Sequence, residues 1–303
     1  MRWMLTRDFM VTRARDMRPR IQNVVDSLIG KMLAGPKPAD IVEAFALPLP
    51  SLVICELLGI RYEQNHSLAE LSCTQLALHS TPEQTSAALY SMLDLLGTVV
   101  DEKNSNPQDD LISRLVVEQM RTGVLTRSAV IDACLLLFVA GHETTANQIA
   151  LSTVLFLQNP DLLAKLRATD DPAAISNAVD EMLRYLTILH LGRPRVVTED
   201  FAFYGHDFKA GDGVIVALNA ANRDEDAFEN PNEIDFGRKA RHHVAFGFGV
   251  HQCIGQALAR AELEVVYSTL YERIPTLALA VAPENVEFKN SIVYGVQRLP
   301  VTW

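Results

Sequence analysis

Residues 243–260 read HVAFGFGVHQCIGQALAR and place one cysteine, Cys253, between a glycine-rich loop and the start of a helical pattern. Glycine lets a backbone approach a flat ligand closely, because it carries no side chain. Backbone N–H groups at the start of a helix favour an anion, which here is the thiolate of Cys253. A thiolate held in this way is a good axial ligand for haem iron.

The cysteine also has an ordinary structural interpretation, since a lone cysteine is most often a small buried apolar residue. Cys253, however, is accompanied by Phe246, Gly249 and Gly255 at the spacing Phe-x-x-Gly-x-x-x-Cys-x-Gly. In this motif the chain resembles the cytochrome P450 haem-thiolate monooxygenases. The resemblance implies haem b as the cofactor and Cys253 as the axial ligand of its iron. It also implies that Gly249 and Gly255 lie against the cofactor and that Phe246 packs beside the sulfur, where it limits access of water.

The other cysteines predict no further chemistry. Cys55, Cys73 and Cys134 lie in apolar helical stretches, and we expect all three to be core residues. No Cys-x-x-Cys pair occurs, so neither a zinc site nor a dithiol redox motif is supported. Four cysteines at irregular positions favour a reducing compartment, and we expect a cytoplasmic protein.

Composition limits the class of protein. The chain has 303 residues, of which 49% are hydrophobic and 21% charged, so it can bury a substantial core. Its net charge of −10 argues against a general nucleic-acid binder. The longest uninterrupted apolar stretch, 133–140, is too short to cross a membrane, and we expect no membrane association.

Periodicity predicts a mainly α fold with a minor β portion. Residues 1–190 have mostly helical patterns, and 191–303 mix strands with one further helix. The resemblance implies that 1–303 form a single catalytic domain, incomplete at its N-terminus, which contains an oxygen-activation helix at 127–157 and a thiolate loop at 246–255. The predicted helices are 24–33, 51–58, 62–79, 82–103, 127–157, 172–186 and 254–271, and the predicted strands are 201–204, 207–209, 214–218 and short segments of 277–303.

The middle of the long predicted helix is unexpectedly polar. Gly141 to Thr145 interrupt an apolar run, where polar groups cost free energy unless they are satisfied. Thr144 can bond back to the carbonyl of Ala140, bend the helix and form a groove for a small ligand; a polar stripe facing solvent is the alternative. The stretch resembles the acid–alcohol pair of the family, which implies that Glu143 and Thr144 deliver protons to dioxygen.

A second motif implies a structural role. Glu181 and Arg184 stand three residues apart on a predicted helix, which is commonly a surface ion pair of little energetic value. They also match the Glu-x-x-Arg motif of the family, and Arg223 lies in a segment that resembles its meander. The resemblance implies that Glu181, Arg184 and Arg223 lock the segment that precedes the cysteine loop, since the planar fork of arginine can bond several acceptors.

Further residues match the family's contacts with haem propionates and substrate. Arg2, Arg195 and His251 match the usual propionate partners, although a frayed exposed terminus is an alternative for Arg2. The implied substrate contacts are mostly apolar and suit an apolar small molecule, whereas His190 could meet a polar substrate group or be an ordinary satisfied histidine. The contacts are Leu136, Val139 and Ala140, then Ile188, Leu189, His190 and Leu191, and finally Ile292, Val293 and Tyr294.

A basic cluster, residues 238–243 with the sequence RKARHH, precedes the cysteine loop in an acidic chain. We interpret it as a docking surface for an acidic electron donor of the ferredoxin type, reduced in turn by an NAD(P)H-dependent ferredoxin reductase. A solvated charged loop is the alternative. Charge reversal at Arg238 and Arg241 would then slow electron delivery.

The resemblance extends over the whole chain but begins inside what resembles the family's third major helix. We therefore expect the preceding helices, several strands and the loop that caps the substrate pocket to be missing. The motifs are most similar to soluble bacterial, particularly actinobacterial, enzymes that oxidise terpenoids, macrolides or foreign compounds. The predicted function is a monooxygenase that uses dioxygen; a peroxygenase that uses hydrogen peroxide and a non-catalytic remnant are the alternatives.

Overall fold

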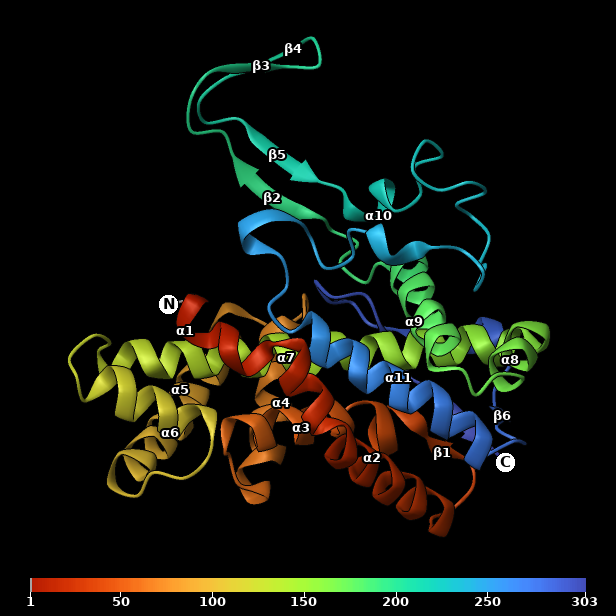
Figure 1. The fold of residues 1–303 in the computed structure, drawn as a ribbon, viewed down its shortest axis with the longest axis horizontal. Helices are drawn as coiled ribbons and strands as arrows, with labels where there is room; N and C mark the ends of the chain where they lie inside the picture. Colours follow the sequence, from red (N-terminus) through yellow and green to blue (C-terminus); the bar gives the residue numbers. More distant parts are fainter. Residues whose placement is uncertain (1) are drawn as a thin grey trace.

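A computed structural model describes residues 2–303, which are arranged around the long helix α7 (Arg127–Gln158) (Figure 1). The side chain of Thr126 accepts a hydrogen bond from the backbone N–H of Ala129 and so caps the first turn. Helix α3 (Pro48–Leu58) crosses α7 closely, because a Cβ built at Gly141 would lie 3.1 Å from the side chain of Ile54. Close helix packing is therefore one reason for the glycine in the polar stretch.

The other long helices surround α7 on several sides. These helices confirm those predicted from periodicity, and most of their ends differ from the prediction by only a few residues. The exception is α2, which begins at Val11, well before the predicted start at residue 24. Helix α5 starts with a capping box of Thr81 and Gln84, and α3 ends at Gly59, whose φ of 82° suits glycine. These helices are α2 (Val11–Ala34), α4 (Tyr62–Leu76), α5 (Pro82–Ser105), α9 (Pro172–Leu186) and α11 (Gln256–Arg273).

Short helical segments join the long helices, and the sequence patterns did not predict them, because one or two turns are too short to show a clear period. Two of them, η2 and η3, are π-helical turns. The segments are α1 (Arg2–Thr6), η1 (Arg7–Phe9), η2 (Val42–Ala46), α6 (Leu111–Leu115), η3 (Val116–Met120), α8 (Pro160–Arg167), α10 (Leu218–Ala221), η4 (Ala240–His242), η5 (Gly249–His251) and η6 (Pro283–Asn285).

The β portion consists of small antiparallel sheets. Strands β1 (Ala39–Asp40), β9 (Pro300–Thr302) and β6 (Ala278–Leu279) form one sheet in that order, and it joins the segment after α2 to the C-terminal segment. Strand β7 (Glu287–Phe288) pairs with β8 (Val296–Arg298), and β2 (Arg193–Val196) pairs with β5 (Gly213–Val216). The predicted hairpin is confirmed as β3 (Phe201–Phe203) and β4 (His206–Phe208), although it turns at Tyr204 and Gly205.

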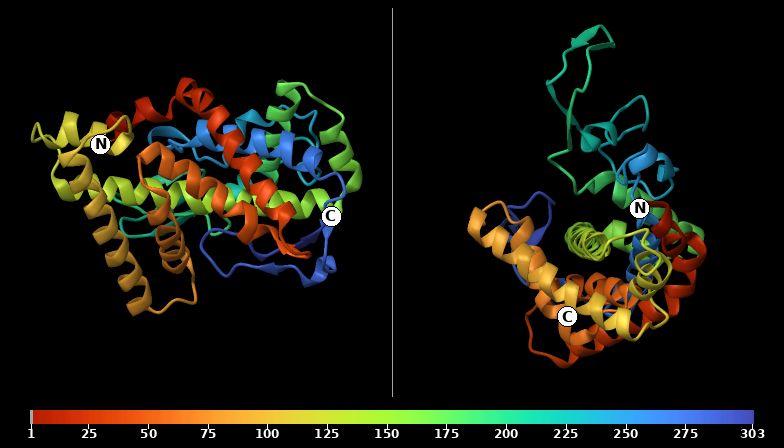
Figure 2. Two further views of the ribbon diagram at one scale, coloured as in Figure 1. Left: turned by 90° about the horizontal axis from the view of Figure 1, so that it is seen from below. Right: turned by 90° about the vertical axis from the view of Figure 1, so that its left-hand side faces the viewer.

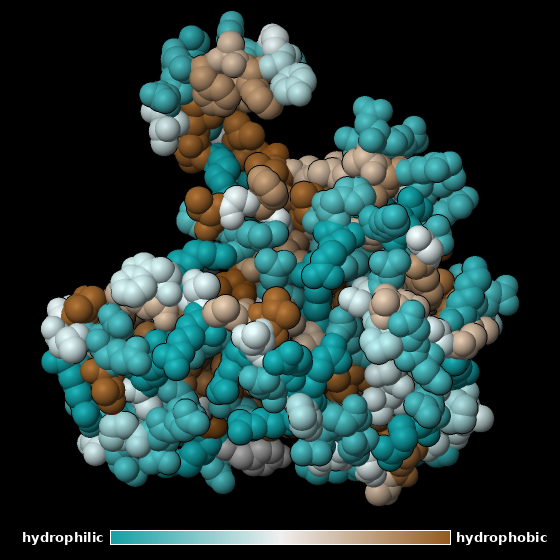
Figure 3. Space-filling view, viewed as in Figure 1, coloured by the Kyte–Doolittle hydropathy of each residue, from teal (hydrophilic) through white to brown (hydrophobic). Residues whose placement is uncertain are grey.

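Strands β2 to β5 form a ribbon that projects from the helical body (Figure 1). It carries exposed apolar side chains, including those of Val196, Phe203 and Ile215, and Figure 3 shows brown and tan surface along this projection. Since strand edges and apolar surface are usually covered in globular proteins, this ribbon is the least protected part of the described chain.

Helix α7 is long and apolar enough to cross a membrane by length and composition alone. It is instead the central core helix, and 56% of its most apolar window is buried inside the structure. Most of its apolar residues, among them Leu137, Phe138 and Phe156, pack against the surrounding helices. Its composition therefore follows from its position in the core.

Candidate active site

The cysteine loop closes on itself immediately before α11. The backbone N–H of Cys253 donates to the carbonyl of Phe246 at 2.9 Å, and the thiol is partly buried. Gly247 and Gly249 have φ values of 70° and 78°, which disfavour any residue with a Cβ. The two glycines therefore shape the turn that brings the sulfur to the N-terminal end of the helix.

The surroundings of the sulfur are electropositive. Burial raises the pKa of the Cys253 thiol, but the backbone N–H of Gly255 and the guanidinium groups of Arg2, Arg260 and Arg193 act in the opposite direction. These groups would stabilise a thiolate. Arg2 is fixed in this position because its side chain donates to the carbonyl of Gln252. The structure thus places Arg2, which is otherwise exposed, directly against the cysteine loop.

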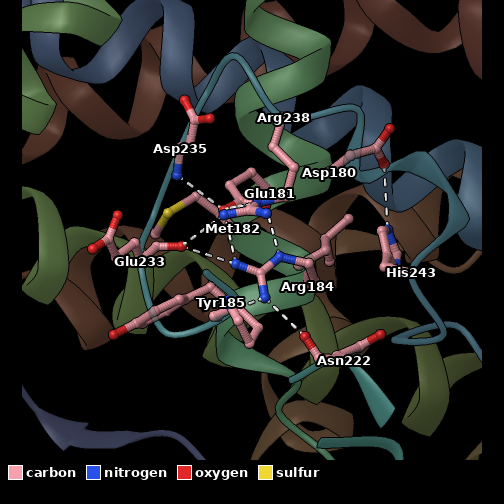
Figure 4. Close-up of polar contacts among 12 residues, drawn as sticks. Asp180, Glu181, Met182, Arg184, Tyr185, Asn222, Glu233, Asp235, Arg238 and His243 are labelled. Carbon is pink, nitrogen blue, oxygen red and sulfur yellow. Dashed lines mark hydrogen bonds and ion pairs between the residues drawn. The ribbon is translucent and has the colours of Figure 1, made fainter. Parts of the chain in front are cut away.

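A buried carboxylate, Asp180 of α9, connects the loop to the helices on either side of it. It accepts a hydrogen bond from Arg260 Nε at 2.7 Å and contacts His243 Nε2 at 3.4 Å (Figure 4). Burial would raise the pKa of Asp180, but His243 and Arg260 lower it below its ordinary value. The guanidinium of Arg260 also lies 4.6 Å from the ring centre of Phe246. Asp180 therefore holds two groups that contact the loop.

Glu181 and Arg184 form a fully buried ion pair on α9 (Figure 4). Arg184 Nε and Nη2 each donate to a carboxylate oxygen of Glu181 at 2.8 Å. Arg184 Nη1 also donates to the carbonyls of Asn222 and Pro231, both at 2.8 Å. One guanidinium therefore joins α9 to the irregular segment that leads to the cysteine loop, so the surface-pair interpretation does not apply.

Two neighbours of this pair extend the network toward the cysteine. Asn222 accepts a hydrogen bond from the backbone N–H of Val244 at 2.8 Å, which fixes the start of the loop. Arg223 donates to the carbonyl of Tyr185 at 2.9 Å and to Asn232 Oδ1 at 2.8 Å, with its guanidinium 3.9 Å from the Tyr185 ring centre. The segment after α10 is thus held by side chains at several points.

The predicted role of Arg238 in a docking surface is wrong. Its side chain is only 11% exposed, lies 3.1 Å from Glu181 Oε1 and donates to the carbonyl of Asn230 at 3.2 Å. A buried carboxylate stabilises a nearby cation, and Arg238 is therefore part of the buried network. Arg241 is 72% exposed, and Lys239 is also exposed, so these two residues keep the basic character of the surface.

One face of α7 is open in the middle of the core. Leu136 is 64% exposed, and Ala140 and Thr144, one and two turns further on, are exposed and partly exposed. Thr144 Oγ1 donates to the carbonyl of Ala140 at 2.7 Å, and α7 continues as an unbroken α-helix through this point. Val139 is half-buried beside this face. The open face therefore presents the threonine next to apolar side chains.

Glu143 points away from this face and is buried. Its carboxylate contacts Cys73 Sγ at 2.8 Å, Lys289 Nζ at 3.0 Å and Asn147 Nδ2 at 3.1 Å. The prediction that Cys73 is an ordinary core residue is wrong, since its thiol is a polar partner of a buried carboxylate in the wall of a cavity. Cys55 and Cys134 are buried as predicted.

Two of the three predicted substrate segments, 188–191 and 292–294, meet. The backbone N–H of Tyr294 donates to the carbonyl of Ile188 at 2.8 Å, and the Tyr294 ring stacks on His190 with centres 4.2 Å apart. His190 also contacts the carbonyl of Leu186 at 3.1 Å, so it is a satisfied histidine. Of the remaining residues, Leu191 and Ile292 are exposed, Leu189 is half-buried and Val293 is buried.

Comparison with known proteins decides the family. The family model for Cytochrome P450 matches residues 174–292. Cytochrome P450-SU2 from Streptomyces griseolus is 48% identical over 304 residues, which cover 100% of this chain and 74% of that protein. The crystal structure of GfsF is 46% identical with a TM-score of 0.93, covering 100% of this chain and 77% of that chain. The chain belongs to the cytochrome P450 family.

Another solved relative has the same fold at lower identity. Mycinamicin VIII C21 methyl hydroxylase MycCI from Micromonospora griseorubida, bound to mycinamicin VIII, is 38% identical with a TM-score of 0.93. It covers 100% of this chain and 77% of that chain. The expected mainly α cytochrome P450 fold is confirmed, and the chain spans about three quarters of the length of these relatives, from 74% to 77%.

Membership makes this protein a haem b-dependent monooxygenase, and its residues fit that cofactor. Within residues 2–303, no group of three or more His, Cys, Asp and Glu side chains could hold a bare metal ion. A cofactor that brings its own nitrogen ligands needs only one thiolate from the protein, and Cys253 is the residue that would supply it. A built Cβ at Gly247 or Gly249 meets nothing within 4 Å, so the loop leaves free space at these two glycines.

Several residues of this cytochrome P450 site were not found by motif. Asp180 directly precedes the Glu-x-x-Arg motif, and Arg260 ends the cysteine stretch. Their positions next to these two motifs are the only sequence features that indicate a role in the site. Lys289 and Cys73 carry no sequence signal, because they reach Glu143 from elements that are distant along the chain. Among the predicted propionate partners, Arg195 on β2 and His251 in η5 are both exposed.

Proposed function

We propose that this cytochrome P450 inserts one oxygen atom from dioxygen into an apolar small molecule of the terpenoid, macrolide or xenobiotic class. The observation that carries the proposal is Thr144, which lies on the open apolar face of α7 next to the acidic Glu143. Relatives named pentalenic acid synthase, at 44% identity, and mycinamicin VIII C21 methyl hydroxylase, at 38%, support these classes. Hydroxylation or epoxidation are the expected reactions.

The proposed cofactor contacts follow from the loop. Cys253 would bind the iron through sulfur, with Phe246, Gly249 and Gly255 beside it. Arg2, Arg195 and His251 would pair with the propionates. Haem b supplies, when bound, the activation of dioxygen and the abstraction of hydrogen from the substrate.

In this proposal the side chains of the protein position the substrate and transfer protons. The Thr144 hydroxyl would hold its proton near the reacting oxygen, while Glu143 connects that position to solvent. Leu136, Val139 and Ala140 would form the substrate surface on α7. The segment 188–191 and the turn 292–294 would form the opposite wall, where the exposed Leu191 and Ile292 favour an apolar substrate.

The proposal predicts uncoupling in Thr144→Ala. We expect electrons from NADPH to be consumed at a similar rate while product per electron falls by about tenfold or more, because proton delivery to the reacting oxygen is lost. A fluorogenic alkoxycoumarin serves as the apolar probe, and released hydrogen peroxide is measured in parallel. The control is Thr98→Ala, which removes an equivalent bond between a threonine and the carbonyl of Asp94 on α5.

Two results would separate this function from a peroxygenase. If hydrogen peroxide alone supports full turnover and Thr144→Ala leaves it unchanged, the protein is a peroxygenase. If Thr144→Ala and Thr98→Ala give the same product per electron with dioxygen, the proposed role of Thr144 is wrong.

We also propose that electrons arrive from a ferredoxin, which a NAD(P)H-dependent ferredoxin reductase reduces. The exposed Arg241 and Lys239 lie next to the cysteine loop and support a basic docking surface. Arg241→Glu should slow reduction by a ferredoxin several-fold at low salt, with the difference shrinking as salt rises. Stopped-flow reduction measures this, and Lys165→Glu on α8 is the matched control. Equal rates for both variants would contradict the docking surface.

We further propose that residues 1–303 act as one catalytic domain in the cytoplasm. A single cluster of buried hydrophobic residues that runs from Met4 to Val301 supports one domain.

A further inference from the structure

The carboxylate of Glu143 is held by partners from different parts of the fold. Cys73 belongs to α4, Lys289 follows β7, and Asn147 lies one turn further along α7. The Glu143 side chain is 3% exposed and that of Lys289 is 10% exposed. A buried carboxylate at this position needs both a cation and hydrogen-bond donors, and the three partners supply them.

The protonation states of Cys73, Glu143 and His142 follow from their burial and their neighbours. Burial raises the pKa of the Cys73 thiol, so it keeps its proton and donates to Glu143. Burial acts to raise the pKa of Glu143, but the charge of Lys289, the neighbouring His142 and the hydrogen bonds from Cys73 and Lys289 together lower that pKa. Burial lowers the pKa of the adjacent His142 to about 4, so this ring is neutral. Glu143 is therefore a carboxylate in a buried site.

A cavity of about 340 Å³ leads from this carboxylate to the surface. Its inner wall includes Cys73 and Glu143, whereas His79, Gln84 and Asn290 line it and are exposed to solvent. Most of the lining residues are polar or charged, so the cavity offers partners for water molecules. The cavity therefore gives the buried carboxylate a polar connection to bulk solvent.

The cavity and the cysteine loop lie on different sides of α7. Figure 2 (right) views α7 nearly along its axis, with α4 and the dark-blue C-terminal segment on one side and the lighter-blue cysteine loop on the other. Neighbouring residues of an α-helix project about 100° apart. Glu143 thus faces the cavity, while Thr144 belongs to the open face with Ala140 and Leu136.

We propose that this cavity is the entry route for protons and that Lys289 and Cys73 are positioning residues that hold Glu143 at its inner end. In this step a proton passes from cavity water to the Glu143 carboxylate and then to the Thr144 side of α7, which regenerates the carboxylate. The inference rests on the proposed monooxygenase function, because that reaction consumes protons at the open face.

Two pairs of variants test the positioning roles. Lys289→Met and Cys73→Val should lower turnover of the alkoxycoumarin by about tenfold and a few-fold respectively, with a larger solvent isotope effect. Lys289→Arg and Cys73→Ser keep the charge and the donor, and should recover most of the rate. The Michaelis constant should change little, since none of these side chains lies on the open face. Unchanged turnover in both Lys289→Met and Cys73→Val would overturn the proposal.

The pH profile gives a second signature. Lys289 helps to keep the pKa of Glu143 below its ordinary value, so activity that needs the carboxylate is lost at lower pH than for an ordinary glutamate. Without Lys289 the largest influence that opposes burial is lost and the pKa of Glu143 rises, so the acid limb of turnover should move to higher pH. His142 and Cys73 face the same carboxylate in both proteins, and Lys289→Arg should leave the limb unshifted.

An infrared measurement tests the contact without any reaction. The S–H stretch of Cys73, assigned by its loss in Cys73→Ser, should shift in Glu143→Gln and in Lys289→Met, because both alter the acceptor. An unmoved band would overturn the cluster. If the band shifts as expected but the protein shows no oxygenation of any probe, the proposed function fails and the geometry of the cluster stands.

Discussion

Cys253→Ala will abolish the thiolate-type absorption shift on binding carbon monoxide and reduce oxygenation to background. The reason is that the cofactor requires one strong protein ligand, and Cys253 is the thiol at the N-terminal end of α11. The other cysteines cannot substitute, because Cys55 and Cys134 are buried elsewhere and Cys73 donates to Glu143. Haem content and the spectrum of the reduced carbonyl complex are the measurements.

Two further variants make this test specific. Cys253→His can retain haem through a nitrogen ligand, and we expect its carbonyl spectrum to lose the thiolate character. Cys134→Ala removes a buried thiol of α7 without touching the loop and should keep the wild-type spectrum. If Cys253→Ala retains haem with an unchanged carbonyl spectrum, the assignment of the ligand is wrong.

The parts of this site that the sequence predicted are those whose determinants are local. The glycines and Cys253 lie within a few residues of one another, and the left-handed φ angles at Gly247 and Gly249 follow from residue type. Helix ends were also predictable, because Gly59 and the box of Thr81 and Gln84 act within one turn. A local motif therefore carries both the fold of the loop and its chemistry.

The surroundings of Glu143 could not be predicted in this way. Cys73 lies 70 residues before it and Lys289 lies 146 residues after it, so only the tertiary fold brings them together. Each residue alone had a more ordinary interpretation, as a core thiol or a surface lysine. Both residues acquire their roles from the buried carboxylate of Glu143, which they contact.

The burial of Arg238 is a second feature that could not be predicted from the sequence. Composition marks residues 238–243 as basic, and a run of charges is usually solvated. Glu181, however, offers its Oε1 to Arg238 as well as to Arg184, and a buried carboxylate is stabilised by a second cation. The charge of Arg238 is visible in the sequence, but its burial depends on the tertiary fold. Burial is what separates Arg238 from the exposed Arg241.

Arg184→Ala will destabilise the fold strongly. It leaves Glu181 buried with one remaining cation and removes the donors to the carbonyls of Asn222 and Pro231. Breaking a buried pair in this way costs about 3–5 kcal/mol, a large share of the stability of an ordinary domain. Urea denaturation followed by circular dichroism measures the loss, and Arg184→Lys should recover little, since an ammonium cannot reproduce the planar fork.

An exposed pair in the same chain provides the matched control. Arg127 bonds Asp101 with two contacts of 2.7 Å, but their side chains are 51% and 59% exposed. Arg127→Ala should therefore cost no more than about 1 kcal/mol, because solvent screens the pair. If both alanine variants lose the same free energy of unfolding, burial is not what gives the Glu181–Arg184 pair its value. The junction between α9 and the cysteine loop would then be held by backbone contacts instead.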